Sequence, residues 1–338
     1  MEKQIEGSNQ KVMVIIDESE YSYHALMWVL DNLKGFITDS PLVMFAALPT
    51  PNCNFAYGAQ LGTTALYCTV SPALGLICSM QEKSKKILLG ILEKAVDICD
   101  SRGVKAETIT EVGEPYELLS SAVQKNKINL LVIGDTPINE TLKRDFLGSQ
   151  SNYCLLKANC SVLVKMAEHV TENGGIPLER KVMVAVDDGE YSHYALTWVL
   201  DNLEESITKS PLVIFTAQPP PSNNHSFTAG ALSSARMYYS VSAIPEYTYT
   251  IQEQNKKIAF ALLEKAKEIC AGRGVEAETL TEVGDPQTAI CDAVQRLNIS
   301  LLVLGERGIG KIKRAIQGSV SSYCLHNAKC PVLVVKKP

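Results

Sequence analysis

The chain repeats itself once, at a period of about 170 residues, and this repeat constrains the fold more than any other feature. Residues 11–33 read KVMVIIDESEYSYHALMWVLDNL and residues 181–203 read KVMVAVDDGEYSHYALTWVLDNL, so 16 of 23 positions are identical. The similarity continues in order: SPLVMFAALP returns as SPLVIFTAQP, TEVGEP as TEVGDP, and NLLVIG as SLLVLG. Repeats of roughly 20–50 residues build solenoids, whereas a repeat this long indicates two copies of one domain.

The repeat sets the predicted domain boundaries. We expect a first domain over residues 1–167, a linker over 168–179 and a second domain over 180–338. The linker is polar and contains glycine, and an apolar β-branched segment at 181–186 opens the second copy. The length of 338 residues fits two domains of about 150 residues each.

Short apolar segments alternate with segments of helical periodicity in each copy. In the second copy the predicted strands are 181–186, 211–217, 277–283, 300–305 and 331–335. The predicted helices are 190–203, 252–273, one opened by Asp285 and Pro286, and 318–327. Gly272 and Gly274 are expected to end the long helix. This alternation predicts, in each copy, a doubly wound parallel five-stranded α/β sheet with helices on both faces. Ligands bind beyond the carboxyl ends of such strands, at the switch point.

Two segments of roughly 30 residues contain no predicted element. They are Pro49–Met80 and Pro219–Thr250, and both follow the second strand of their copy. Loops of this length are usually functional or disordered. We therefore expect them near the ligand cleft, with a surface for a protein partner as the alternative for the apolar first segment.

The charge and the cysteines narrow the class of protein. The net charge is -5 and like charges form no long run, so a nucleic-acid partner is not expected. No apolar run approaches the roughly 18 residues of a membrane span, and the polar first ten residues lack a signal-peptide core. The ten cysteines form no C-x-x-C pair and are interpreted as reduced thiols. We expect a cytoplasmic protein, with the nucleus as a further compartment.

A glycine-rich segment after the fourth strand of the second copy carries the main functional signal. Residues 305–319 read GERGIGKIKRAIQGS. Glycines let a backbone approach a ligand without Cβ clashes, and the helix expected from Gly318-Ser319 offers free N–H groups to phosphate. Lys311, Lys313 and Arg314 add positive charge. The segment predicts a phosphate site, and a surface turn with an ordinary N-cap serine is the alternative.

The same segment is not a P-loop. Gly305–Lys311 fits G-x4-G-K, but Ile312 follows where Mg²⁺ requires a Ser or Thr hydroxyl. The G-x-G-x-x-G fingerprint of dinucleotide-binding folds is also missing from the segment. A P-loop enzyme and a dinucleotide-binding enzyme are therefore both disfavoured.

The spacing G-x2-G-x9-G-S, at Gly305, Gly308 and Gly318-Ser319, resembles that of the ATP-binding universal stress proteins. The segments VMVAVDDGEYSHYAL and YCLHNAKCPVLVV are similar to the opening and closing parts of the same family. The resemblance covers both copies and is strongest to plant members of tandem form. It implies a stress-response protein that binds ATP or AMP, with Mg²⁺ as a companion.

The resemblance also implies a role for each matching residue. Asp187 would accept hydrogen bonds from the ribose or the adenine, and the backbone of Ala217 would meet the adenine edge. Leu304 and Gly305 would lie along the ribose and the α-phosphate. A helix-capping role before Gly189 is the alternative for Asp187. The residues that would follow the phosphates or close the cradle are Arg307, Gly308, Gly310, Gly318, Ser319, Val320 and Ser321.

The first copy departs from this pattern. Asp17, Gly134 and Gly148-Ser149 match the second copy, but Pro137 replaces Gly308 and the following spacing is ten residues instead of nine. Proline removes a backbone donor. Acidic residues also outnumber basic ones in this loop, and their negative charge would repel phosphate. The acidic residues are Asp135, Glu140 and Asp145, and the basic residues are Lys143 and Arg144. We expect the first copy to bind nucleotide weakly or not at all.

The sequence assigns no catalytic residue. It contains no recognisable Ser-His-Asp set, carboxylate pair or nucleophile elbow, and no general base is evident beside the expected γ-phosphate. A binding and regulatory module is expected. The alternatives are a slow ATP hydrolase, a small-molecule enzyme that uses a long-loop pocket, and a scaffold without nucleotide.

Cys324 and Cys330 flank His326, but the first copy has Leu156 at the histidine position, which favours core thiols over a metal site.

The closing strands 160–165 and 330–335 are apolar and are expected at a sheet edge. Exposed apolar edges invite pairing. The family resemblance implies that single-domain members dimerise through this strand. We therefore expect the two copies to pair within the chain as a pseudo-dimer.

Overall fold

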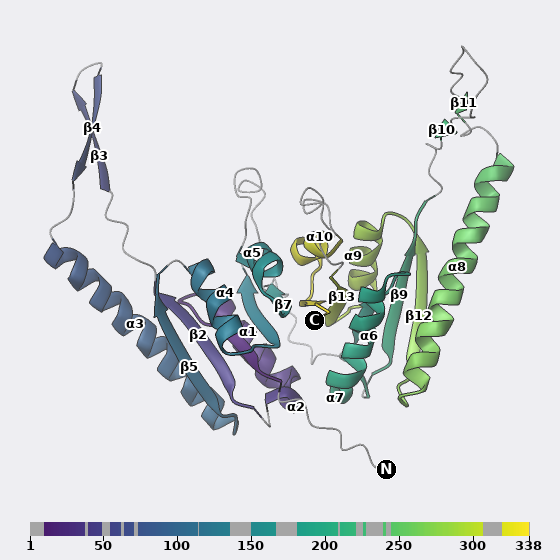
Figure 1. The fold of residues 1–338 in the computed structure, drawn as a ribbon, viewed down its shortest axis with the longest axis horizontal. Helices are drawn as coiled ribbons and strands as arrows, with labels where there is room; N and C mark the ends of the chain where they lie inside the picture. The colour runs from purple at the N-terminus through teal and green to yellow at the C-terminus, as the bar shows by residue number, and fades with distance from the viewer. Residues whose placement is uncertain are drawn as a thin grey trace. The chain divides into compact units, whose positions relative to one another are not determined.

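The computed structural model describes residues 10–37, 40–48, 55–61, 64–70, 74–113, 115–135, 150–166, 181–208, 210–220, 226–227, 239–240, 245–306 and 320–337. The chain divides into two compact units, residues 1–167 and 168–338 (Figure 1). The predicted linker 168–179 lies outside the described residues.

In unit one, five of the described strands form a parallel sheet with the order β5-β2-β1-β6-β7. These strands are β1 (Val12–Ile15), β2 (Leu42–Leu48), β5 (Ala106–Val112), β6 (Leu130–Asp135) and β7 (Ser161–Met166). The described helices are α1 (Glu20–Asn32), α2 (Lys34–Ile37), α3 (Leu74–Ser101), α4 (Pro115–Lys125) and α5 (Gln150–Lys157).

Unit two repeats this arrangement in its described strands, with the order β12-β9-β8-β13-β14. The strands are β8 (Val182–Ala185), β9 (Leu212–Gln218), β12 (Ala277–Val283), β13 (Leu301–Gly305) and β14 (Val332–Val335). The described helices are α6 (Glu190–Asn202), α7 (Glu204–Ile207), α8 (Pro245–Ala271), α9 (Pro286–Arg296) and α10 (Val320–Asn327). The predicted α/β fold with parallel sheets is confirmed in both units.

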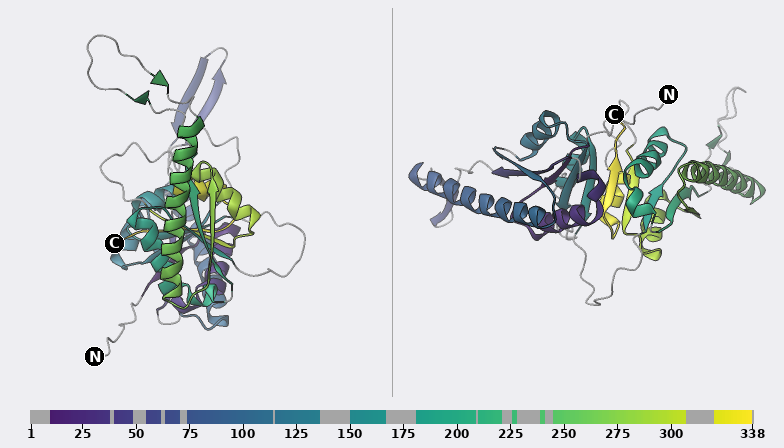
Figure 2. Two further views of the ribbon diagram at one scale, coloured as in Figure 1. Left: turned by 90° about the vertical axis from the view of Figure 1, so that its right-hand side faces the viewer. Right: turned by 90° about the horizontal axis from the view of Figure 1, so that it is seen from below.

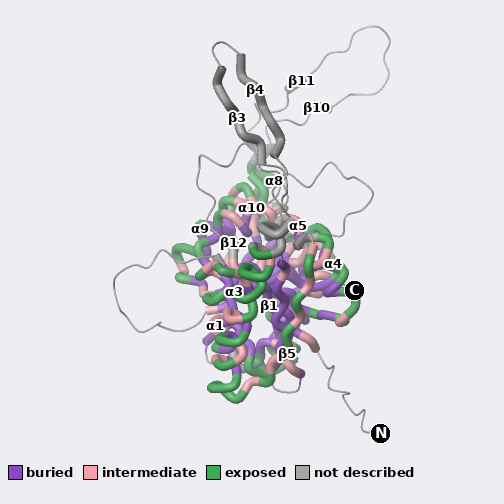
Figure 3. The backbone as a smooth tube through the Cα atoms, turned by 90° about the vertical axis from the view of Figure 1, so that its left-hand side faces the viewer, coloured by how far each residue is buried: buried purple, intermediate pink, exposed green. Residues whose placement is uncertain are grey.

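The central strands form the core of each unit. Every residue of β1 is buried (Figure 3). Every residue of β14 is buried too, and β9 is buried at all but one position. Such continuous apolar strands are expected where helices cover both faces of a parallel sheet. The largest side chains with almost no exposure include Phe45 and Met13 in unit one and Phe215 and Met183 in unit two.

Two predicted helix signals are present in unit two. The side chain of Asp285 caps α9 by accepting hydrogen bonds from the N–H groups of Gln287 and Thr288, and Pro286 is the first helical residue. Gly274 has a φ of +71°, after α8 has ended at Ala271. This left-handed backbone favours glycine, so the predicted stop of the long helix is confirmed.

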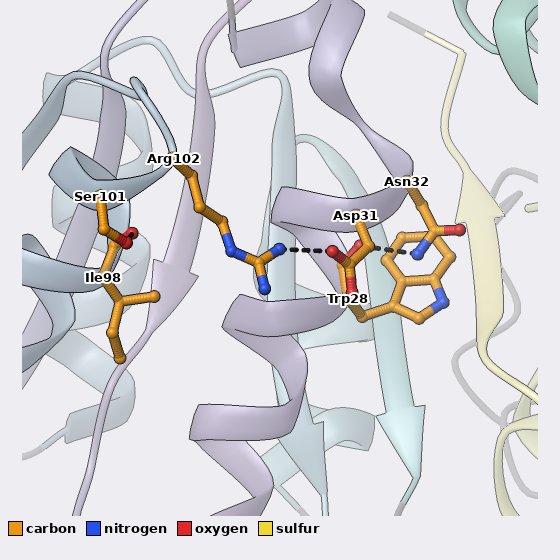
Figure 4. Close-up of polar contacts among 6 residues, drawn as sticks. All are labelled: Trp28, Asp31, Asn32, Ile98, Ser101 and Arg102. Atoms are coloured by element: carbon orange, nitrogen blue, oxygen red, sulfur yellow. Dashed lines mark hydrogen bonds and ion pairs between the residues drawn. The ribbon is translucent and has the colours of Figure 1, made fainter.

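Each unit ties its first helix to the end of its long helix. In unit one the Arg102 guanidinium donates to the Asp31 carboxylate, which joins α3 to α1 (Figure 4). In unit two the equivalent contact joins Arg273 to Asp201. Both ion pairs are partly exposed. The repeat of these side-chain contacts shows that the units share local packing as well as topology.

The long segments contain more secondary structure than the sequence predicted. In the first, β3 (Phe55–Leu61) and β4 (Thr64–Val70) form an antiparallel hairpin. In the second, β10 (Ser226–Phe227) pairs with β11 (Tyr239–Ser240) (Figure 2). Helix α8 begins at Pro245 rather than Gln252, because proline suits the first turn of a helix, where no N–H partner is needed.

Within the part of the chain that the structure describes, no helix has both the length and the apolar character needed to cross a bilayer.

Candidate functional site

The candidate site lies at the carboxyl edge of the unit-two sheet. Strand β8 is central and pairs with β9 on one side and β13 on the other. The chain runs outward from β8 to β9 and β12, then returns to β13 and β14 on the opposite side. This reversal makes the gap between the ends of β8 and β13 the switch point, where ligands bind in open α/β sheets.

Asp187 follows β8 and is half-buried at this edge. Its Oδ1 accepts hydrogen bonds from the Gly189 N–H, at 3.0 Å, and from the Ser192 hydroxyl, at 2.7 Å. Ser192 is only 6% exposed. Two donors from the following turn therefore fix the orientation of the Asp187 carboxylate.

The helix-capping alternative for Asp187 does not fit this geometry. The N-cap of α6 is Gly189, which has no side chain to accept a hydrogen bond. The Asp187 carboxylate instead bonds to the N–H of Gly189 itself, two residues along the chain. Asp187 therefore stabilises the turn before the helix. Its predicted contact with a sugar or base stays a prediction.

Ala217 lies near the end of β9, at the same carboxyl edge of the sheet as Asp187. It is the penultimate residue of β9, and the register pairs Ala185 of β8 with Phe215 of β9, so Ala217 comes next to the end of β8. The N–H of Val186 donates to the Phe215 carbonyl at 2.8 Å, which continues the ladder toward this point. Asp187 and Ala217 thus belong to the ends of adjacent strands, and their predicted contacts with adenine or ribose stay predictions.

Gly305 ends β13, and close packing against a helix, besides the predicted approach of a ligand, accounts for glycine at this position. A Cβ at Gly305 would lie 2.4 Å from the backbone carbonyl oxygen of Tyr191, in the first turn of α6. The matching Gly134 is as close to Tyr21, at 2.1 Å. Close helix packing therefore requires glycine in both units. Because packing alone requires glycine at this position, the presence of Gly134 in unit one does not indicate a ligand site there.

The remaining predicted residues divide into two groups. Leu304 is buried in the sheet at 4% exposure, and Val320 and Ser321 begin α10 and are half-buried. The loop residues lie outside the described residues, namely Arg307, Gly308, Gly310, Gly318 and Ser319. Their predicted contacts with phosphate stay predictions.

In unit one, the matching aspartate has different hydrogen-bond partners. Oδ1 of Asp17 accepts from both the N–H and the hydroxyl of Ser19. Ser19 is also the N-cap of α1, and its hydroxyl accepts from the Ser22 N–H at 3.3 Å. The carboxylate of unit one is therefore bound into its helix cap, whereas unit two has glycine at that position.

Two cysteines near the site are core residues, as predicted. Cys324 in α10 and Cys330 are 0% and 4% exposed. The Cys324 sulfur lies 3.9 Å from that of Cys291 in α9. The hydrogen bond with Cys291 and burial raise the pKa of the Cys324 thiol. Among the described residues, no group of three or more His, Cys, Asp or Glu side chains is arranged to hold a metal ion.

A model of the universal stress protein family matches residues 63–165 and 179–336, one match in each unit. The chain belongs to the universal stress protein family. This finding confirms the family that the loop spacing and the opening and closing segments indicated.

Similar proteins come from several kingdoms. Universal stress protein A-like protein of Arabidopsis thaliana is 36% identical over 98 residues, which are 29% of this chain and 56% of that protein. The match thus spans little more than half of that relative. A universal stress protein from Archaeoglobus fulgidus shares the fold, with a TM-score of 0.63 over 97% of both chains at 18% identity. A universal stress protein family structure from Arabidopsis thaliana with AMP bound is 27% identical and covers 47% of this chain and 92% of that chain, with a TM-score of 0.32.

Proposed function

We propose that unit two binds an adenine nucleotide, ATP or AMP, and that the chain acts as a regulatory binding module in the stress response. One observation carries the proposal. Asp187 and Gly305 lie on the two sides of the switch point, as Asp17 and Gly134 do in unit one, but unit two alone has the full G-x2-G-x9-G-S spacing. The G-x2-G-x9-G-S spacing starts at that same Gly305 and leads into α10.

The carboxylate of Asp187 is suited to hold a sugar or a base. Because Gly189 and Ser192 already hold one of its oxygens, its orientation is set before a ligand arrives. A preorganised group loses less entropy on binding. A carboxylate accepts hydrogen bonds from ribose hydroxyls or from an exocyclic amine. Phosphates would then extend toward the loop that follows Gly305 and toward the N-terminus of α10, with Mg²⁺ as their counterion.

Regulation rather than turnover is the proposed activity. The residues assigned to the site are a carboxylate that orients the ligand, backbone N–H donors and cations. These groups bind a nucleotide but do not include an assigned base that would activate water beside the γ-phosphate. The bound nucleotide would act by changing the surface offered to partners, with the long segments 49–80 and 219–250 as candidate contact regions.

Nucleotide release tests the proposal directly. The purified chain is denatured, the supernatant is assayed for nucleotide, and phosphate release from added ATP is followed over hours. Bound ATP or AMP without turnover is the expected result. Accumulation of ADP would instead indicate a hydrolase. An empty protein that also fails to bind added nucleotide would contradict the proposal.

The pairing of the closing strands β7 and β14 within one chain stays a proposal. Crosslinking between cysteines introduced near residues 165 and 335, together with solution scattering, tests it. Two units that scatter as independent bodies would contradict it.

A cytoplasmic and nuclear location is likewise proposed, and a fluorescent fusion would test it.

A further inference from the structure

Glu306 places a carboxylate at the start of the loop assigned to phosphate. It follows β13 directly, and its N–H donates to the Val335 carbonyl at 2.9 Å, so the ladder with β14 continues to this residue. Burial raises the pKa of the Glu306 carboxyl, while Lys336 lowers it. A negative charge at this place repels phosphate unless something compensates it.

Lys336 compensates this charge from the neighbouring strand. The register pairs Gly305 with Val335, so Glu306 and Lys336 come opposite each other one residue later. The Lys336 Nζ lies 3.1 Å from Oε2 of Glu306, and the two side chains are only 13% and 17% exposed. Salt and water screen a pair buried to this extent less than a surface pair.

Unit one has an acid at the matching position, but the residue opposite it in the register is not a lysine, although Lys165 comes one residue earlier on β7. Asp135 occupies the place of Glu306, and the register pairs Asp135 with Met166. The position that holds Lys336 in unit two is therefore an uncharged methionine in unit one. This difference adds to the excess of acidic residues in the first loop. The loop sequences alone do not show this difference, because Glu306 and Lys336 are 30 residues apart in the chain.

We propose that Lys336 is a positioning residue of the nucleotide site in unit two. It holds the Glu306 carboxylate against β14 and neutralises it. Without Lys336, the charge of that carboxylate would be uncompensated and would repel the phosphates. The inference rests on the proposed function and deepens it, because it names a residue outside the loop on which phosphate affinity depends.

The test is calorimetric titration of the full chain with ATP and with AMP. Lys336→Met, which introduces the residue of unit one, should weaken ATP binding by about tenfold, and AMP binding by less, because AMP carries less phosphate charge. Lys336→Arg should keep the affinity. The double variant Glu306→Gln/Lys336→Met should regain it to within about twofold, since it has no carboxylate left to neutralise.

Lys337→Met is the matched control. Lys337 is the next residue of the same strand end and pairs with Glu190 at 2.7 Å, but both side chains are exposed, at 42% and 63%. Its loss should leave nucleotide affinity unchanged. Melting temperatures of all variants show whether each of them is folded.

Failure of the proposed function and failure of the role of Lys336 give different results in these titrations. If the wild-type chain binds no nucleotide, the proposed function fails. If it binds nucleotide and Lys336→Met binds equally well, only this inference is overturned. If the single variant is weakened and Glu306→Gln does not restore it, Lys336 acts on the ligand or the fold directly, and the positioning role is wrong.

Discussion

Units one and two share the contacts that their fold needs and differ at the carboxyl edge of the sheet. The ion pairs Asp31–Arg102 and Asp201–Arg273 match, and so do the close approaches at Gly134 and Gly305. These contacts hold helices to each other or to a strand end. The differences concern the residues that follow the strands, where a ligand would bind.

The two aspartates show how little a shared residue proves. Asp17 and Asp187 occupy the same place after the first strand of each unit. The carboxylate in unit one bonds to Ser19, which caps its helix, whereas the carboxylate in unit two bonds to a glycine N–H and a buried serine hydroxyl. The same acid therefore serves two arrangements, and only one of them is proposed to bind nucleotide.

The largest predicted effect concerns a packing contact that both units share, the close approach of a helix to Gly134 and to Gly305. Gly134→Ala and Gly305→Ala should each lower the free energy of unfolding by about 3 kcal/mol or more, because the new Cβ meets helix backbone that cannot move aside. Chemical denaturation measures this. Gly90→Ala, in α3, is the control, since nothing lies within 4 Å of its added Cβ. It should stabilise the chain by about 0.5–1 kcal/mol.

A Gly305→Ala variant of unchanged stability that loses only nucleotide binding would contradict this account. The glycine would then serve the ligand and not the packing of α6.

The second prediction concerns two equivalent core thiols. Cys99 and Cys270 are both fully buried, and burial raises the pKa of each thiol from 9.0 to about 11, with Asp100 adding to the effect at Cys99. Between these pH values the folded chain holds protons that the unfolded chain has lost. The free energy of unfolding should therefore fall as the pH rises through this window, by at most about 1.4 kcal/mol per pH unit and thiol.

Denaturation at a series of pH values, with Cys99→Ala and Cys270→Ala, measures this slope. Each variant should flatten it by a similar amount. A slope that neither substitution changes would show that other groups cause the alkaline loss of stability.

The third prediction separates the two aspartates. Asp187→Asn keeps a hydrogen-bond acceptor for Gly189 but loses the charge, and should weaken nucleotide binding by about 10- to 100-fold. Asp17→Asn should leave the affinity unchanged. Calorimetric titration measures both. Equal losses in the two variants would mean that both units bind nucleotide.

The smallest effect is expected from the matched ion pairs. Arg102→Gln and Arg273→Gln remove contacts that are partly exposed and screened by water. Each should lower the melting temperature only slightly, and by a similar amount, as measured by thermal unfolding in low salt. A large loss in one unit alone would show that the two long helices are held differently.

Much of the scaffold could be predicted because its signals are local. The predicted strand 277–283 is β12 without any change of boundary, and the Asp285-Pro286 cap and the left-handed Gly274 follow from short-range backbone rules. The buried strands were recognisable because a sheet covered on both faces leaves no polar alternation.

What could not be predicted depends on contacts between distant segments. The clash that demands Gly305 comes from α6, more than 100 residues earlier in the chain. The pair Glu306–Lys336 depends on strand register, which a sequence does not state. The β3–β4 hairpin was missed because its segment has no strict alternation of polar and apolar residues, the usual signal of a half-buried strand.

The number of nucleotides bound per chain tests the central claim most directly. Calorimetric titration with ATP should give one site per full-length chain, abolished by Gly318→Val, because a β-branched side chain would fill the phosphate space, and kept in the matching variant Gly148→Val. Two equivalent sites, or binding that survives Gly318→Val, would contradict the assignment of the nucleotide to unit two.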